Sequence, residues 1–115
     1  MNSAYVKIRI PYNGVYALGP GKADILEAIQ QLGSISAAAK SMGMSYKRAW
    51  DLVDTMNRSF IEPLVATATG GNHGGGAEVT EFGLQILNVY RQMQQKANAA
   101  INDELEGLHK LLKNQ

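Results

Sequence analysis

The stretch SISAAAKSMGMSYKRAWDLVDTMNR, residues 34–58, decides the fold. The segments on either side of Gly43 predict two helices, over 37–42 and about 46–58. Gly43 stands where the first helix must end, and glycine adopts the left-handed conformation of a helix end without a steric penalty. The stretch therefore predicts two helices joined by a tight turn.

Two serines stand close to the starts of these helices. Ser36 is expected to cap the first helix and Ser45 the second, because a serine hydroxyl accepts a hydrogen bond from a free N–H of the first helical turn. The three alanines at 37–39 allow another helix to approach closely. Small residues and a turn glycine between two crossing helices are typical of a helix-turn-helix.

The second helix has two different faces. Its apolar residues lie on one side at 100° per residue: Tyr46, Ala49, Leu52, Val53 and Met56, with Trp50 at the margin. We interpret Trp50 as part of the core. The other side carries Lys47, Arg48, Asp51, Asp54, Thr55 and Arg58, which are donors and acceptors suited to base edges and phosphates. The alternative is a solvated face, in which Lys47–Asp51 and Asp54–Arg58 are ordinary i,i+4 pairs.

The composition is that of one globular domain of 115 residues, with 45% hydrophobic and 18% charged residues. The absence of cysteine excludes disulfides, a thiolate nucleophile and a zinc finger, and two isolated histidines do not form a metal site. No catalytic motif is present, so we expect neither an enzyme nor a cofactor. No long apolar run opens the chain, which predicts a cytoplasmic protein without a membrane segment.

The net charge of +1 does not by itself indicate a nucleic-acid partner. Its distribution is more informative. Seven of the eleven lysines and arginines precede residue 61, whereas six of the ten acidic residues follow residue 60. The basic excess therefore accompanies the helix-turn-helix and favours DNA binding weakly.

Before this motif, the chain predicts a short β-segment and one helix. Apolar residues alternate with Lys7 and Arg9 over 6–10, the pattern of a half-buried strand that Pro11 would end. Asn13-Gly14 predicts a tight turn before a second strand over 15–18, so this region is either a hairpin or one strand that pairs elsewhere. Residues 22–32 then predict a helix that completes a three-helix core.

Residues 64–79 predict a glycine-rich hairpin. Pro63 ends the preceding helix, strands are expected over 64–69 and 77–79, and five glycines lie between them. A hairpin in this position is interpreted as the wing of a winged helix, which can lie along the DNA backbone or in the minor groove. A nucleotide-binding loop would need a Walker-type lysine or a GxGxxG motif, and neither is present.

The last segment predicts a long amphipathic helix capped by Thr80. Its apolar residues recur every three to four positions: Phe82, Ile86, Val89, Tyr90, Met93, Ala97, Ile101, Leu105, Leu108 and Leu112. One small domain cannot cover this stripe, so we expect a homodimer through this helix. A break near Asn102 or Gly107, with the helix folding back on itself, is the alternative.

Three segments in this order resemble the N-terminal DNA-binding domain of ModE-type, molybdate-responsive transcriptional regulators: GPGKADILEAI, GSISAAAKSMGMSYKRAWDLVDTMN and TGGNHGGGAEVTEFG. The resemblance covers roughly residues 18–90. It implies a winged helix-turn-helix that dimerises through long helices and binds palindromic operators. By this resemblance, Ser45, Tyr46, Lys47, Arg48 and Trp50 match the start of the recognition helix, and Gly70, Gly71, Gly74, Gly75 and Gly76 match the wing tip.

The sequence departs from that family in two respects. The full-length regulators continue into a β-rich molybdate-binding region, and no such segment follows here, so we expect no molybdate site in this chain. The family's wing usually carries arginine or lysine, whereas this wing holds Ala66, Thr67, Ala68, Asn72 and His73. Fewer phosphate contacts imply weaker binding and a shallower salt dependence.

Together these observations predict a mainly α fold with small β elements, a winged helix-turn-helix over residues 1–80 and a long C-terminal dimerisation helix over 81–115. We expect a homodimeric, sequence-specific regulator that binds double-stranded DNA, with the recognition helix at about 45–58 and the wing at about 64–79. The alternative is a winged-helix protein-interaction module without specific DNA binding. The residues expected to contact DNA are Ser36, Ser45, Tyr46, Lys47, Arg48, Asp51, Thr69, Gly70, Gly71, Asn72 and His73.

Overall fold

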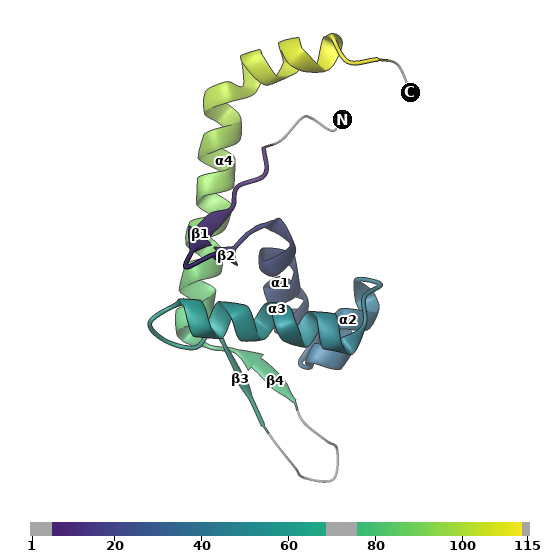
Figure 1. Cartoon of the computed structure of the whole chain (residues 1–115), viewed down its shortest axis with the longest axis vertical. Helices are drawn as coiled ribbons and strands as arrows, with labels where there is room; N and C mark the ends of the chain where they lie inside the picture. Colours follow the sequence, from purple (N-terminus) through teal and green to yellow (C-terminus); the bar gives the residue numbers. More distant parts are fainter. Residues whose placement is uncertain (1–5, 69–75, 114–115) are drawn as a thin grey trace.

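The computed structural model describes residues 6–68 and 76–113. Within them the elements follow in the order β1 (Ile10–Tyr12), β2 (Val15–Leu18), α1 (Pro20–Leu32), α2 (Ile35–Ser41), α3 (Tyr46–Ser59), β3 (Val65–Thr67), β4 (Ala77–Val79) and α4 (Glu81–Lys110). Helices α1, α2 and α3 form a body with the short strands around it, and α4 extends away from it (Figure 1). The mainly α fold with small β elements is confirmed.

The core lies where α1, α2 and α3 pack together with the first turns of α4. Ala38 and Ala49 are fully buried, so the predicted small residues do bring α2 and α3 close together. Each large buried apolar side chain contributes roughly 1.5–3 kcal/mol to folding. The largest fully buried side chains are Tyr90, Ile25, Leu26, Ile29, Met56 and Leu64.

The N-terminal residues form a hairpin, but its first strand lies further along the chain than predicted. Asn13 and Gly14 both have positive φ, 48° and 80°, as a type I′ turn requires. Pro11 does not end the strand. It lies inside β1, with an irregular register between Ile10 and Pro11. The hairpin has only two strands, so each strand has an outer edge without a partner. Proline has no backbone N–H, and at such an edge this absence costs no hydrogen bond between the strands.

Residues 6–9 run beside α4 instead of forming a strand. The N–H of Val6 donates to Asn98 Oδ1 at 2.8 Å, and the hydroxyl of Tyr90 donates to the carbonyl of Ile8 at 2.6 Å. The predicted alternation is nevertheless visible, since Val6 and Ile8 are half-buried and Lys7 and Arg9 are exposed. This segment therefore ties the chain's beginning to the long helix.

Helix α2 begins earlier than predicted, and its cap is a different serine. Gly33 ends α1 in the left-handed conformation, with φ 79°. Ser34 then accepts a hydrogen bond from the N–H of Ala37 at 2.9 Å. The prediction that Ser36 caps this helix is wrong, because Ile35 must already be helical to be buried. Ser36 lies exposed in the first turn.

Strands β3 and β4 pair antiparallel, with Val65 opposite Val79 and Thr67 opposite Ala77. β3 is shorter than the predicted 64–69, although the N–H of Ala68 still donates to Gly76 O at 3.0 Å. On the other side of β4, the N–H of Ala77 donates to the carbonyl of Gly33 at 2.9 Å. Backbone hydrogen bonds thus attach the base of this hairpin to the end of α1.

The side chain of Asn57 fixes the start of β3. Its Oδ1 accepts from the N–H groups of Leu64 and Val65 at 2.8 and 3.2 Å, and its Nδ2 donates to Val65 O at 3.0 Å. One residue at the end of α3 therefore satisfies three backbone groups at the point where the chain turns into the strand pair.

Helix α4 is continuous over 30 residues, so the alternative, a break near Asn102 or Gly107 with the helix folding back on itself, does not occur. Thr80 caps it as predicted, accepting from Gly83 N at 2.9 Å. Only its first turns are buried in the core, and its last turns run at a steep angle to the rest (Figure 1). Arg91 joins it to α1 through Asp24, at 3.0 Å, and Glu27.

Candidate nucleic-acid interface

The candidate interface is built around the turn between α2 and α3. Gly43 has φ 69°, which confirms its predicted left-handed conformation. Ser45 is the N-cap of α3, as predicted, and its hydroxyl accepts from the N–H of Arg48 at 3.1 Å. The cap fixes where α3 begins, and the first turn of α3 therefore presents a defined set of exposed side chains.

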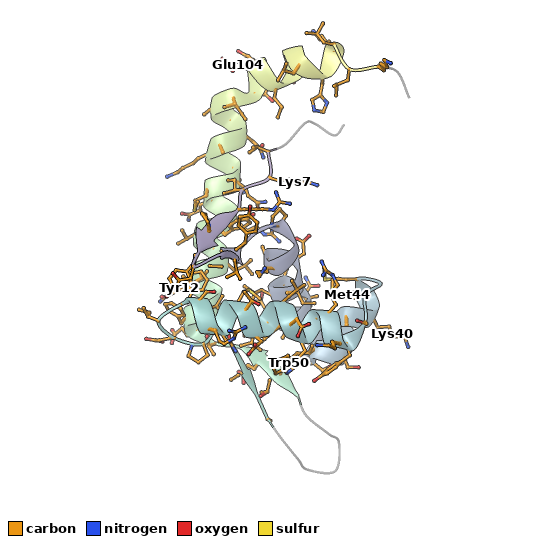
Figure 2. The ribbon with its side chains drawn as sticks, viewed as in Figure 1. Lys7, Tyr12, Lys40, Met44, Trp50 and Glu104 are labelled. Carbon is orange, nitrogen blue, oxygen red and sulfur yellow. The ribbon has the colours of Figure 1, made fainter. Side chains whose placement is uncertain are left out.

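Two aromatic side chains are exposed on α3. Tyr46 is 55% exposed and Trp50 is 44% exposed. Figure 2 labels Trp50 on α3. The interpretation of Trp50 as a core residue is wrong, and Tyr46 does not join the buried face either. That face consists of Ala49, Val53 and Met56, and it is narrower than the helical periodicity predicted. The start of α3 therefore offers apolar as well as polar contact surface.

The charged residues of α3 form two ion pairs along its surface. Lys47 Nζ lies 3.2 Å from Asp51 Oδ2, and Arg58 Nε lies 2.9 Å from Asp54 Oδ2. Exposed pairs of this kind contribute only about 0.3–0.5 kcal/mol each, so a phosphate or base edge can compete for the cation. Arg48 has no carboxylate partner among residues 6–68 and 76–113.

Lys22, which the sequence analysis did not include, lies near Arg48. Burial, and then the positive charge of Arg48, lower the pKa of the Lys22 ammonium. The two residues come from α1 and α3, so no local pattern in the sequence brings them together. The first turn of α1 thus adds a cation beside the start of α3.

The structure brings together only some of the residues predicted to contact DNA. Ser45, Tyr46, Lys47, Arg48 and Asp51 are all exposed at the beginning of α3, and Ser36 is exposed on the neighbouring α2. Thr69, Gly70, Gly71, Asn72 and His73 lie outside the described residues. The described part of the candidate interface is therefore the α2–α3 pair and the base of the β3–β4 hairpin.

The described residues contain neither a metal-binding cluster nor a membrane-spanning helix. Over 6–68 and 76–113, no group of three or more histidine, cysteine or acidic side chains is arranged to hold a metal ion. Within those ranges, no helix is long and apolar enough to cross a membrane.

The fold is that of a winged-helix protein. A MarR family protein from Bacillus stearothermophilus superposes with a TM-score of 0.54 over 82% of this chain and 69% of that chain, at 20% identity. ArgP from Mycobacterium tuberculosis gives 0.52 over 74% of this chain and 30% of that chain, at 18% identity. At these identities the likeness concerns the fold alone.

Proteins similar in sequence show which winged-helix family the chain is related to, although no family model matches the chain. It is 41% identical over 95 residues to the molybdenum transport protein ModE of Azotobacter vinelandii. It is 42% identical over 88 residues to the DNA-binding transcriptional dual regulator ModE of Escherichia coli K12. It is 34% identical over 115 residues to the transcriptional regulator ModE of Haemophilus influenzae.

These matches cover 83%, 74% and 97% of this chain, and 35%, 34% and 45% of the three relatives. The chain thus spans less than half the length of the curated relatives it matches. It is homologous to the N-terminal region of the ModE-type regulators, which confirms the resemblance. The relatives from Escherichia coli K12 and Haemophilus influenzae are named as regulators rather than enzymes, in agreement with the expectation from the sequence.

Proposed function

We propose that this protein is a DNA-binding transcriptional regulator that acts as a homodimer. The observation that carries the proposal is the exposed first half of α3, where a serine cap, two aromatic rings and cations lie together on a helix-turn-helix. One of its relatives, from Escherichia coli K12, is named as a DNA-binding transcriptional dual regulator. An α-helix fits the major groove of B-DNA, and the second helix of this motif is the one that enters it.

The side chains of α3 divide by the chemistry they can perform. Arg48 and Lys47 can donate to guanine O6 and N7 or to phosphate oxygens, and the carboxylate of Asp51 can accept from a cytosine amino group. Tyr46 and Trp50 supply apolar surface that can contact a thymine methyl group. Ser45 and Ser36 lie near helix N-termini, where they can donate to phosphates.

The β3–β4 hairpin is the proposed wing, with Thr69, Gly70, Gly71, Asn72 and His73 near its tip in the sequence. Its base is attached to α1 and α3 by the bonds of Ala77 and Asn57. We assign it to the DNA backbone or the minor groove. Few of its residues are charged, so it would add little to the salt dependence of binding.

The homodimer is proposed from the exposed apolar side chains that continue along α4. In water such a stripe favours pairing with a second copy of the same helix. Exposed along it are Val89, Met93, Ile101 and Leu108, and Leu111 and Leu112 are exposed directly after its end. A two-fold dimer would present two α3 helices to two half-sites of a palindromic operator.

A protein-interaction module is the second candidate. The net charge is near zero, and Lys47 and Arg58 are already paired with carboxylates of α3. A protein partner could use the exposed Tyr46 and Trp50 as apolar anchors. Such a module would show little salt-dependent affinity for duplex DNA.

Selection of randomised duplexes by the purified protein, followed by sequencing, tests the proposal. Enrichment of a two-fold symmetric motif is the expected result, with half-sites about one helical turn, ~34–36 Å, or a multiple of it apart. An enriched motif without symmetry would contradict the dimer but retain DNA binding. No enrichment by a folded protein would transfer the assignment to the interaction module.

A further inference from the structure

A groove lined by four cations lies beside α3. Lys7 and Arg9 enter it from the N-terminal segment, Lys22 from the first turn of α1, and Arg48 from α3. Its volume is about 330 Å³, and the rest of its lining is neutral. Three segments that are distant in the sequence thus place like charges around one depression.

These cations form no ion pair in the described part of the chain. The ion pairs of residues 6–68 and 76–113 involve Lys47, Arg58 and Arg91, and none involves a cation of the groove. Arg9 is held at the wall by the ring of Tyr16, with its guanidinium carbon 5.8 Å from the ring centre. The lowered pKa of Lys22 reflects burial first and the charge of Arg48 second. An anion in the groove would relieve this repulsion.

The start of α1 adds partial positive charge to the same groove. Gly19 is its N-cap and provides no side-chain acceptor for the N–H groups of the first turn. A β-carbon at Gly21 would meet nothing within 4 Å, so the backbone is open to close approach by a ligand. Helix N-termini favour anions, and here that field coincides with four full charges.

We propose that this groove binds phosphate groups of the DNA backbone next to the major groove that α3 reads. The inference rests on the proposed function and extends it to a second contact surface. Arg48 and Leu52 line the groove from α3, so a phosphate held there lies directly beside that helix. In the view of Figure 1, the beginning of α1 lies above α3 and strands β3 and β4 lie below it. DNA would therefore be held on both flanks of the recognition helix.

The test compares the double variant Lys7→Gln/Lys22→Gln with the control Lys96→Gln/Lys110→Gln, which removes equal charge from α4. Affinities of the full chain are measured over a series of salt concentrations, for a selected duplex and a scrambled one. The groove variant should lower the slope of log K against log salt by about 0.9 for each phosphate that is no longer neutralised, roughly 1.8 per bound protomer, on both duplexes. The ratio of the two affinities should stay unchanged, because phosphate contacts carry no sequence information.

A groove variant with the wild-type slope would overturn the inference and leave the proposed function intact. A wild-type protein without salt-dependent affinity would instead overturn both. Amide resonances of Gly21 and Lys22 in the wild-type protein give an independent measurement if the variant does not fold. They should shift on adding the duplex. Shifts with inorganic phosphate at equal ionic strength, but none with the duplex, would assign the groove to a free anion and refute the proposal.

Discussion

At the scale of single residues, the exposed rings of Tyr46 and Trp50 distinguish α3 from an ordinary amphipathic helix. One exposed aromatic residue is common on a protein surface, but these two lie one helical turn apart beside Lys47 and Arg48. Helical periodicity placed Trp50 at the edge of the apolar face. Whether an edge position is buried depends on which neighbouring element covers it, and that information is not local to the helix.

Arg48→Ala should weaken specific DNA binding by about 1–3 kcal/mol without unfolding the domain. The reason is that Arg48 is exposed at the start of α3, has no carboxylate partner among the described residues and can reach either a base or a phosphate. Fluorescence anisotropy with the selected duplex measures the loss, and a thermal melt checks the fold. Lys96→Ala, on α4, is the control. An Arg48→Ala protein with wild-type affinity would remove Arg48 from the interface.

Asn57 shows what residue patterns do not reveal. An asparagine near the end of a helix carries no distinctive signal, yet its side chain satisfies three backbone groups of Leu64 and Val65. Buried or half-buried polar groups need such partners, but the partner's identity depends on where the chain passes after the helix ends. The two strands were therefore predictable from the sequence, whereas the residue that positions them was not.

At the scale of elements, the helices were predictable because their ends are chemically marked. Gly33 and Gly43 adopt the left-handed conformation, and Ser45 and Thr80 act as N-caps. The error at α2 arose because two serines flank Ile35, and both are acceptable caps. The choice of Ser34 follows from tertiary packing, since Ile35 is buried.

Two glycines in α4 should respond oppositely to alanine. A β-carbon at Gly83 would collide with the carbonyl oxygen of Leu64 and the side chain of Val79, whereas at Gly107 it would meet nothing within 4 Å. Gly83→Ala should therefore destabilise the fold by about 1–3 kcal/mol. Gly107→Ala should stabilise the helix by roughly 0.5–1 kcal/mol. Urea unfolding measures both, and an equal effect of the two substitutions would contradict the close contact at Gly83.

At the scale of the whole molecule, the length of α4 was predictable and its course was not. The apolar repeat extends through 30 residues, but it does not indicate that residues 6–9 would lie against the helix. The alternative of a break near Asn102 or Gly107 did not predict a continuous helix whose last turns bend away (Figure 1). The basic groove was also beyond sequence analysis, because its cations come from three separate segments. Local periodicity predicts individual helices and strands. Which of these elements contact one another becomes known only from the folded structure.

Ile101→Glu should raise the dimer dissociation constant at least ~10-fold, which corresponds to about 1.4 kcal/mol. The substitution places a charge in the exposed apolar stripe of α4, and a seam between two helices would have to desolvate it. Sedimentation equilibrium measures the constant. Ala99→Glu adds the same charge on the opposite side of the helix and should leave it unchanged. A wild-type protein that is monomeric at all concentrations would refute the dimer.

The attachment of β4 to α1 also has an evolutionary consequence. The N–H of Ala77 and the carbonyl of Gly33 are backbone groups, so their bond tolerates most substitutions of neighbouring side chains. Insertions, deletions and charge changes between residues 68 and 76 can then accumulate while the anchoring point of the hairpin stays in place. Descendants of such a chain could vary the residues between 68 and 76, and with them the contacts of the hairpin, without having to evolve a new core.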